Sequence, residues 1–245
     1  MDLQIFGQGS PVLLLHGVPT RLRALHFLVH VLERDHRCLL PALPGFEGST
    51  PLDPYDYDRV QALLEELILA QEEPVDVVGF SGSTYRALQL ALDRRVRIRR
   101  LVLLGAMPGF AEKEAPLSFV ADIRSGALDI RGQWLARMTS PGFADRNLDA
   151  ARHILEWMDA APTSVWCDEF ESIVRRPDLL PRLGEVEVPV LLRVGEADAA
   201  TPATLSEAVA RVLPDATLQI VPGVGHALGY EDGPATAAAV RDFLI

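Results

Sequence analysis

A short apolar run that ends in an abrupt turn constrains the fold of this chain more than any other feature. The run Val75–Phe80 leads into Ser81 and Gly82, and a helical pattern follows. A serine at such an apex is lifted out of the sheet, so its hydroxyl faces an open site. The residues two before and two after the apex must be small, because strand and helix nearly touch there, and Gly79 and Ser83 meet this requirement. Ser81 is therefore the candidate nucleophile.

Short apolar runs alternate with longer segments of helical period along most of the chain. This alternation is typical of a parallel sheet that helices cover on both faces. The predicted strands are Leu3–Phe6, Val12–His16, Arg37–Leu40, Val75–Phe80, Arg99–Gly105, Val188–Val194 and Thr217–Val221. The predicted helices are Leu22–Glu33, Arg59–Glu72, Gly82–Asp93, Pro202–Leu213 and Gly233–Phe243. The sequence thus predicts an α/β fold with a mostly parallel, doubly wound sheet.

This alternation is interrupted once. Residues 107–187 contain no convincing strand but have helical windows at 147–159 and 163–175. We therefore expect a core domain of residues 1–106 and 188–245, with residues 107–187 inserted as a helical cap between two strands. Ligands in open α/β sheets bind at the carboxyl ends of the strands, so a cap at that edge would roof the site.

A serine hydroxyl needs a base to remove its proton, and the base needs an acid to orient it. Loops after the last two predicted strands supply Asp198 and His226. The order Ser81, Asp198, His226 is a known nucleophile–acid–base order. Glu196 and Asp232 are alternative acids. We favour Asp198 because it is the later acid in its loop and because aspartate is the commoner orienting residue.

Attack on a carbonyl places negative charge on its oxygen, and two backbone N–H groups usually stabilise that charge. The predicted donors are Gly82, directly after the nucleophile, and Val18, in the turn after an earlier strand. Gly17 permits that turn. We interpret His16 as a residue that orients the same loop through hydrogen bonds.

These motifs together resemble those of the α/β-hydrolase superfamily over essentially the whole chain. The matching motifs are the His16-Gly17 turn, the 44–49 loop, the Ser81 elbow, the 195–198 loop and Gly225-His226. The resemblance implies the α/β-hydrolase fold and a serine–histidine–aspartate triad without a metal or other cofactor. Phe80 stands where the family often has histidine and would make the floor beside the nucleophile more apolar.

Two parts of the cap, residues 137–144 and 167–183, are similar to 3-oxoadipate enol-lactone hydrolases. This resemblance makes Arg137 a candidate clamp for a substrate carboxylate. The candidate substrate-binding residues are His16, Phe80, Trp134, Arg137 and Phe143. Further cap aromatics that could line the pocket are Phe110, Phe119, Trp157 and Trp166.

The predicted function is hydrolysis of a small, fairly apolar carboxylic ester or lactone through an acyl-enzyme. An aspartate nucleophile is disfavoured because no acid lies between Gly79 and Thr84. Three alternatives keep the triad: a metal-free haloperoxidase or perhydrolase, a C–C hydrolase, and a lyase. A non-catalytic ligand-binding protein on the same fold is a further alternative.

The charge balance argues against polyanionic partners. The chain has 23 basic and 34 acidic residues, and the resulting net charge of −11 repels phosphate backbones and anionic lipid. We therefore expect a small-molecule substrate and neither a nucleic acid nor a membrane partner, and a homodimer is one open alternative for the assembly. Cys38 and Cys167 fit free thiols in a reducing cytosol, and the start of the chain shows no signal peptide, so a cytoplasmic location is expected.

Overall fold

Seven strands form one sheet in the computed structural model, which describes residues 1–245. The strand order is β1-β3-β2-β4-β5-β6-β7, and only the β1–β3 pair is antiparallel. The strands are β1 (Leu3–Phe6), β2 (Ser10–Leu15), β3 (His36–Pro41), β4 (Val75–Phe80), β5 (Ile98–Leu104), β6 (Val190–Gly195) and β7 (Ala216–Val221). The mostly parallel sheet predicted from the sequence is confirmed. Every residue of β4 and β6 is buried, which explains why these strands are mainly apolar, with Asp76 and Arg193 as their only charged residues.

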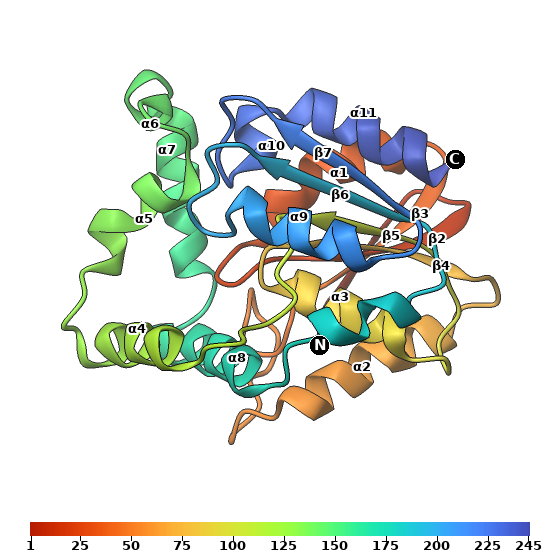
Figure 1. Ribbon diagram of the computed structural model, residues 1–245, viewed down its shortest axis with the longest axis horizontal. Coiled ribbons are helices and arrows are strands. Elements are labelled where there is room, and N and C mark those ends of the chain that lie inside the picture. The colour runs from red at the N-terminus through yellow and green to blue at the C-terminus, as the bar shows by residue number, and fades with distance from the viewer.

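Helices cover both faces of this sheet (Figure 1). α1 and α11 pack against each other on one face, and α2, α3 and α9 lie on the other. Their bounds are α1 (His26–Leu32), α2 (Tyr57–Leu69), α3 (Ser83–Leu92), α9 (Ala203–Val212), the short α10 (Leu228–Glu231) and α11 (Gly233–Leu244). The predicted helix 22–33 is divided into a 3₁₀ turn, η1 (Leu22–Leu25), and α1. No helix of the structure has both the length and the apolar character needed to cross a membrane.

The chain between β5 and β6 contains helices and no strand. These elements are α4 (Glu114–Ser125), α5 (Ile130–Met138), α6 (Phe143–Arg146), α7 (Leu148–Leu155), η2 (Glu156–Ala160), α8 (Thr163–Arg175) and η3 (Leu180–Glu185). Figure 1 shows α4 to α8 gathered beside the end of the sheet to which the arrowheads of β6 and β7 point. We call the helices α4 to α8 the cap. They cover the edge where loops after parallel strands place functional side chains.

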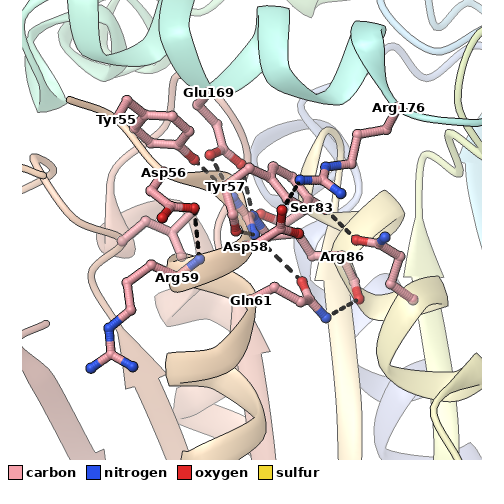
Figure 2. A network of polar contacts seen from close by, with 12 residues as sticks. Tyr55, Asp56, Tyr57, Asp58, Arg59, Gln61, Ser83, Arg86, Glu169 and Arg176 are labelled. Atoms are coloured by element: carbon pink, nitrogen blue, oxygen red, sulfur yellow. Dashed lines mark hydrogen bonds and ion pairs between the residues drawn. The ribbon is translucent and has the colours of Figure 1, made fainter.

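A buried ion pair joins the cap to the core (Figure 2). Arg86 of α3 and Glu169 of α8 are 0% and 1% exposed, and the guanidinium donates to both carboxylate oxygens, at 2.8 and 2.6 Å. The same guanidinium donates to the carbonyl of Tyr57, the side chain of Gln61 and the hydroxyl of Tyr55. Such a bidentate pair with its remaining donors satisfied is a directional contact, which fixes α8 relative to α3.

Candidate active site

Ser81 lies at the apex between β4 and α3 with a φ of +55°, a conformation that non-glycine residues rarely adopt. Its own N–H donates to the carbonyl of Leu104 at 2.9 Å, which holds the apex against β5. A Cβ on Gly79 would lie 3.0 Å from Ala87 Cβ and from the backbone of Thr84, so the strand and the helix touch as the sequence pattern requires. The sharp turn exposes the Ser81 side chain to the space beyond the strand end.

His226 and Asp198 meet in the loops after β7 and β6. His226 Nδ1 lies 2.7 Å from Asp198 Oδ2, and both side chains are buried. The other contacts of the Asp198 carboxylate are the N–H of Ala200 at 2.9 Å, the N–H of Thr201 at 2.7 Å and the Thr201 hydroxyl at 3.0 Å. An ionised carboxylate only accepts hydrogen bonds, so this network places the proton of the neutral imidazole on Nδ1 and leaves Nε2 as an acceptor.

The environment of Asp198 keeps it ionised. Burial opposes ionisation, but the neighbouring His226 and the hydrogen bonds from His226 and Thr201 outweigh it and hold the pKa of Asp198 below its usual value. Asp198 therefore carries its charge at neutral pH. A charged carboxylate at this position orients the imidazole and stabilises its protonated form.

The two alternative acids contact other groups. Glu196 accepts a hydrogen bond from the N–H of Gly223 at 3.0 Å, and Asp232 pairs with Arg193 and accepts from Thr236 at 2.8 Å. Neither carboxylate contacts His226, so Asp198 is the acid that the structure brings to the imidazole.

Ser81 and His226 line the same cavity. His226 Nε2 is buried and has no hydrogen-bond partner, so no Ser81–His226 hydrogen bond is formed in this structure. Hydrogen bonds of catalytic groups are often long in sites without substrate and shorten when it binds. The free, buried Nε2 acceptor is the atom that could take a proton from a hydroxyl in this cavity.

The cavity has a volume of about 350 Å³ and lies between the core and the cap. Core residues in its wall include Val18, Gly82 and Thr201, together with the two residues above. Most of the remaining wall is apolar or aromatic and comes from the cap: Phe119, Ile130, Trp134, Met138, Trp166 and Phe170. Arg137 is the one residue in the wall with a permanent charge, and its guanidinium lies 4.7 Å from the centre of the Phe119 ring.

The two predicted oxyanion donors lie next to the nucleophile. A Cβ on Gly17 would lie 3.0 Å from Ser81 Cβ, so the turn after β2 is in contact with the apex. A Cβ on Gly82 would lie 3.5 Å from Val18 Cβ, and both residues line the cavity. The structure therefore brings Val18 and Gly82 to the same side of the site as Ser81.

Three of the predicted substrate-binding residues, His16, Phe80 and Phe143, are not among the residues that line this cavity. His16 is buried, accepts from the N–H of Leu43 at 3.1 Å and contacts the carbonyl of Gly17 at 2.9 Å. This is the loop-orienting role expected for it, and burial lowers the pKa of His16 to about 4, so the ring is neutral. Phe143 lies half-buried in α6, away from the lining residues.

Phe80 is the third of these residues. Its ring stacks on the imidazole of His226, with centroids 5.0 Å apart and an angle of 26° between the planes, and it makes an edge-on aromatic contact with Trp157 of the cap. Phe80 therefore supports the candidate base instead of contacting a ligand. Trp157, another aromatic residue predicted to line the pocket, packs against Phe80 and does not line the cavity.

Thr201 and Phe170 are among the contributors that the sequence does not single out. Thr201 bonds Asp198 and lies 3.2 Å from His226 Nδ1, and Phe170 lines the cavity. The spacing of Thr201, three residues after an aspartate, is the local signal that points to a side-chain-to-backbone turn. No three metal-ligating side chains of the structure come together as a metal site.

Comparisons with known proteins agree with the fold. The model of the alpha/beta hydrolase family matches residues 12–240. The pimeloyl-[acyl-carrier protein] methyl ester esterase of Nitrosomonas europaea is 26% identical over 240 residues, 93% of this chain and 92% of that protein. A putative non-heme chloroperoxidase of Synechocystis is 26% identical over 267 residues, 97% of this chain and 92% of that one. The crystal structure of the enol-lactonase from Burkholderia xenovorans LB400 superposes with a TM-score of 0.88 at 20% identity, covering 99% of this chain and 95% of the other, and shows the shared fold.

Proposed function

The chain belongs to the alpha/beta hydrolase family, and we propose that it is a serine hydrolase that cleaves a small carboxylic ester or lactone. In this proposal Ser81, His226 and Asp198 are the nucleophile, the base and the orienting acid. No metal or cofactor takes part. The methyl ester esterase of Nitrosomonas europaea is a relative of similar length, and its name supports ester cleavage as the reaction class.

The reaction begins when Ser81 Oγ attacks the substrate carbonyl carbon and its proton passes to His226 Nε2. The resulting oxyanion is held by the backbone N–H groups of Val18 and Gly82, each of which is worth about 3–4 kcal/mol of transition-state stabilisation. The imidazolium then gives its proton to the departing alkoxide, and the acyl-enzyme remains. Water, deprotonated by the same nitrogen, attacks the acyl carbon and releases the acid and free Ser81. Asp198 accepts the hydrogen bond from the Nδ1–H group of His226 throughout the reaction.

The observation that carries this proposal is the buried Nε2 of His226, which has no partner and shares a cavity with the Ser81 apex. A buried polar atom normally has a hydrogen-bond partner, and an exception calls for an explanation. Here the missing partner is a hydroxyl or water of the reaction. The carboxylate of Asp198 on the opposite ring nitrogen supplies the orientation that a general base needs.

The substrate proposal follows from the cavity wall. At about 350 Å³ the cavity accepts a small molecule and is at the lower end of the usual range for ligand sites. Its aromatic lining favours an apolar acyl or alcohol chain. The Arg137 guanidinium lies over the Phe119 ring, in a cavity wall that contains no carboxylate. We therefore propose that Arg137 receives a carboxylate at the far end of the substrate.

The test is the Ser81→Ala protein, assayed on short p-nitrophenyl esters and with a fluorophosphonate probe. Removal of the nucleophile should lower the rate by roughly 10⁴–10⁶-fold and abolish labelling. The control is Ser125→Ala, which removes a hydroxyl from the exposed end of α4 and should leave both readouts unchanged. Wild-type turnover in Ser81→Ala would refute the proposal, and lack of labelling in the wild type would favour a ligand-binding protein.

A second candidate reaction uses the same residues with hydrogen peroxide in place of water. The putative chloroperoxidase, which matches nearly the whole chain, favours testing it. The acyl-enzyme would then release a peracid, which oxidises halide without a metal. Assays with an ester, peroxide and bromide would distinguish the two, because a perhydrolase forms peracid faster than the free acid.

A further inference from the structure

Glu231, the last residue of α10, joins the loop that carries His226 to the cap. Its Oε1 accepts a hydrogen bond from the N–H of Gly225, directly before His226, at 3.1 Å. Its Oε2 accepts from the N–H of Ser140, just after α5 of the cap, at 3.0 Å. The two oxygens of this carboxylate thus bind two different backbone segments, which are distant from each other in the sequence.

The same two segments are also in direct contact. The N–H of Ala227, directly after His226, donates to the carbonyl of Met138 at 2.7 Å. A Cβ on Gly225 would lie 2.4 Å from the nitrogen of Ser140, so the backbones approach as closely as only glycine allows. His226 is therefore attached to the cap through both of its chain neighbours.

The cap segment that receives these contacts also shapes the cavity. Arg137 and Met138, at the end of α5, line the cavity, and Met138 is also one of the two residues bonded to the His226 loop or to Glu231, the other being Ser140. One short stretch of cap thus contacts the ligand space on one side and the base-carrying loop on the other. A displacement of this stretch would move the cavity wall and the imidazole together.

We propose that Glu231 is a positioning residue, whose carboxylate locks the His226 loop onto residues 138–140 and so sets the direction of the imidazole toward Ser81. This inference rests on the proposed function of His226 as the general base. Glu231 touches neither the cavity nor the reacting atoms and acts only through His226.

The chemistry of the carboxylate explains why this position needs an acid. Two N–H donors face it, and a carboxylate can accept from both at once through two charge-assisted hydrogen bonds. In Glu231→Gln one oxygen is replaced by an NH₂ group, which cannot accept from the second N–H. In Glu231→Asp the charge is kept, but the side chain is one methylene too short to span both donors.

Glu196 offers a matched control. It is also a glutamate, and it also accepts a backbone N–H of the same loop, that of Gly223 at 3.0 Å. Its contact is exposed and does not involve the cap. Glu196→Gln therefore replaces the charged acceptor of one N–H of the loop by a neutral amide oxygen, while the attachment to residues 138–140 stays.

The first experiment does not depend on catalysis. Amide hydrogen exchange should become faster at Ser140, Gly225 and Ala227 in Glu231→Gln, because all three N–H groups belong to the attachment. In Glu196→Gln the increase should be confined to Gly223. Unchanged exchange at Ser140 and Ala227 in Glu231→Gln would overturn the inference, even if Ser81 proved not to be a nucleophile.

The second experiment measures kcat and KM on p-nitrophenyl acetate, a substrate too short to need the far wall of the cavity. Glu231→Gln and Glu231→Asp should each lose about 10–100-fold in kcat with little change in KM, the effect of a misdirected catalytic group. Glu196→Gln should keep wild-type kcat. Wild-type kcat in Glu231→Asp, or an equal loss in Glu196→Gln, would refute the positioning role. The Ser81→Ala protein separates this outcome from failure of the proposed function, since only that variant tests the nucleophile.

Discussion

The Arg86–Glu169 pair allows a quantitative test of how the cap is held. Both side chains are at most 1% exposed, so replacing Glu169 by glutamine leaves the guanidinium buried without its counter-charge. Burial lowers the pKa of Arg86 to about 10 and raises the pKa of Glu169, while the bidentate contact at 2.8 and 2.6 Å opposes both shifts and keeps the pair ionised at neutral pH. Breaking a buried pair in this way costs about 3–5 kcal/mol.

For a chain of 245 residues, this loss corresponds to a fall in melting temperature of about 6–20 °C. Replacing both partners, as in Arg86→Met/Glu169→Leu, removes both charges together and should bring the stability back to within about 2 kcal/mol of the wild type. The double variant would then be more stable than the single one. Urea unfolding of the wild type, Arg86→Met, Glu169→Leu and the double variant gives the coupling energy directly.

The chain contains a matched exposed pair. Arg59 and Glu66 lie 3.0 Å apart with side chains 52% and 60% exposed, so Glu66→Gln should cost less than about 1 kcal/mol. If Glu169→Gln destabilised the protein as little as Glu66→Gln, the buried pair would not hold the cap. A double variant as unstable as Glu169→Gln alone would refute the argument that the unpaired charge is the cause.

Two further predictions concern the pH dependence and the substrate. In the unfolded chain His16 takes up a proton as the pH falls below about 6.5, whereas in the folded protein the ring stays neutral down to about pH 4. The free energy of unfolding should therefore fall by about 3 kcal/mol between these two pH values because of this residue. Urea unfolding between pH 7 and 4 should therefore show a flatter profile for His16→Gln, and an equally steep one would contradict the assignment. Arg137→Gln should raise KM by about 10–100-fold for esters whose acyl chain ends in a carboxylate, through loss of a charged hydrogen bond. Esters of equal length with an uncharged end should be unaffected, and an equal loss on both would show that Arg137 only shapes the wall.

The fold was predictable because its central strands are buried on both faces. Val75–Phe80 and the serine turn after it are a local pattern, and the structure reproduces that strand at the predicted bounds. Asp198 and His226 could be proposed because they follow strands of a parallel sheet, and such loops meet at one edge. In each case the signal lies within a few residues of the element that it predicts.

The cavity wall was predictable only in part, because it depends on how distant helices cross. Phe80 precedes Ser81 in the sequence, but successive side chains of a strand point to opposite faces, and its ring lies under His226 instead of in the cavity. Phe143 and Phe170 are both cap aromatics, yet only Phe170 lines the cavity, and nothing in their local sequence separates them. The Arg86–Glu169 pair joins residues 83 positions apart, and a charged residue in a helix is ordinarily expected at the surface.

Helix α8 shows how one cap element can serve both substrate contact and anchoring. Trp166 and Phe170, one helical turn apart, line the cavity. Glu169 pairs with Arg86 of the core, and Ile173, a turn further on, lies 3.8 Å from where a Cβ on Gly82 would be. Positions 166, 169, 170 and 173 follow the i, i+3, i+4, i+7 spacing of a single helix face, so the cavity contacts and the core contacts of α8 lie side by side. A substitution at 166 or 170 that reshapes the cavity wall should therefore also disturb the neighbouring contacts at 169 and 173, which hold the helix against the core.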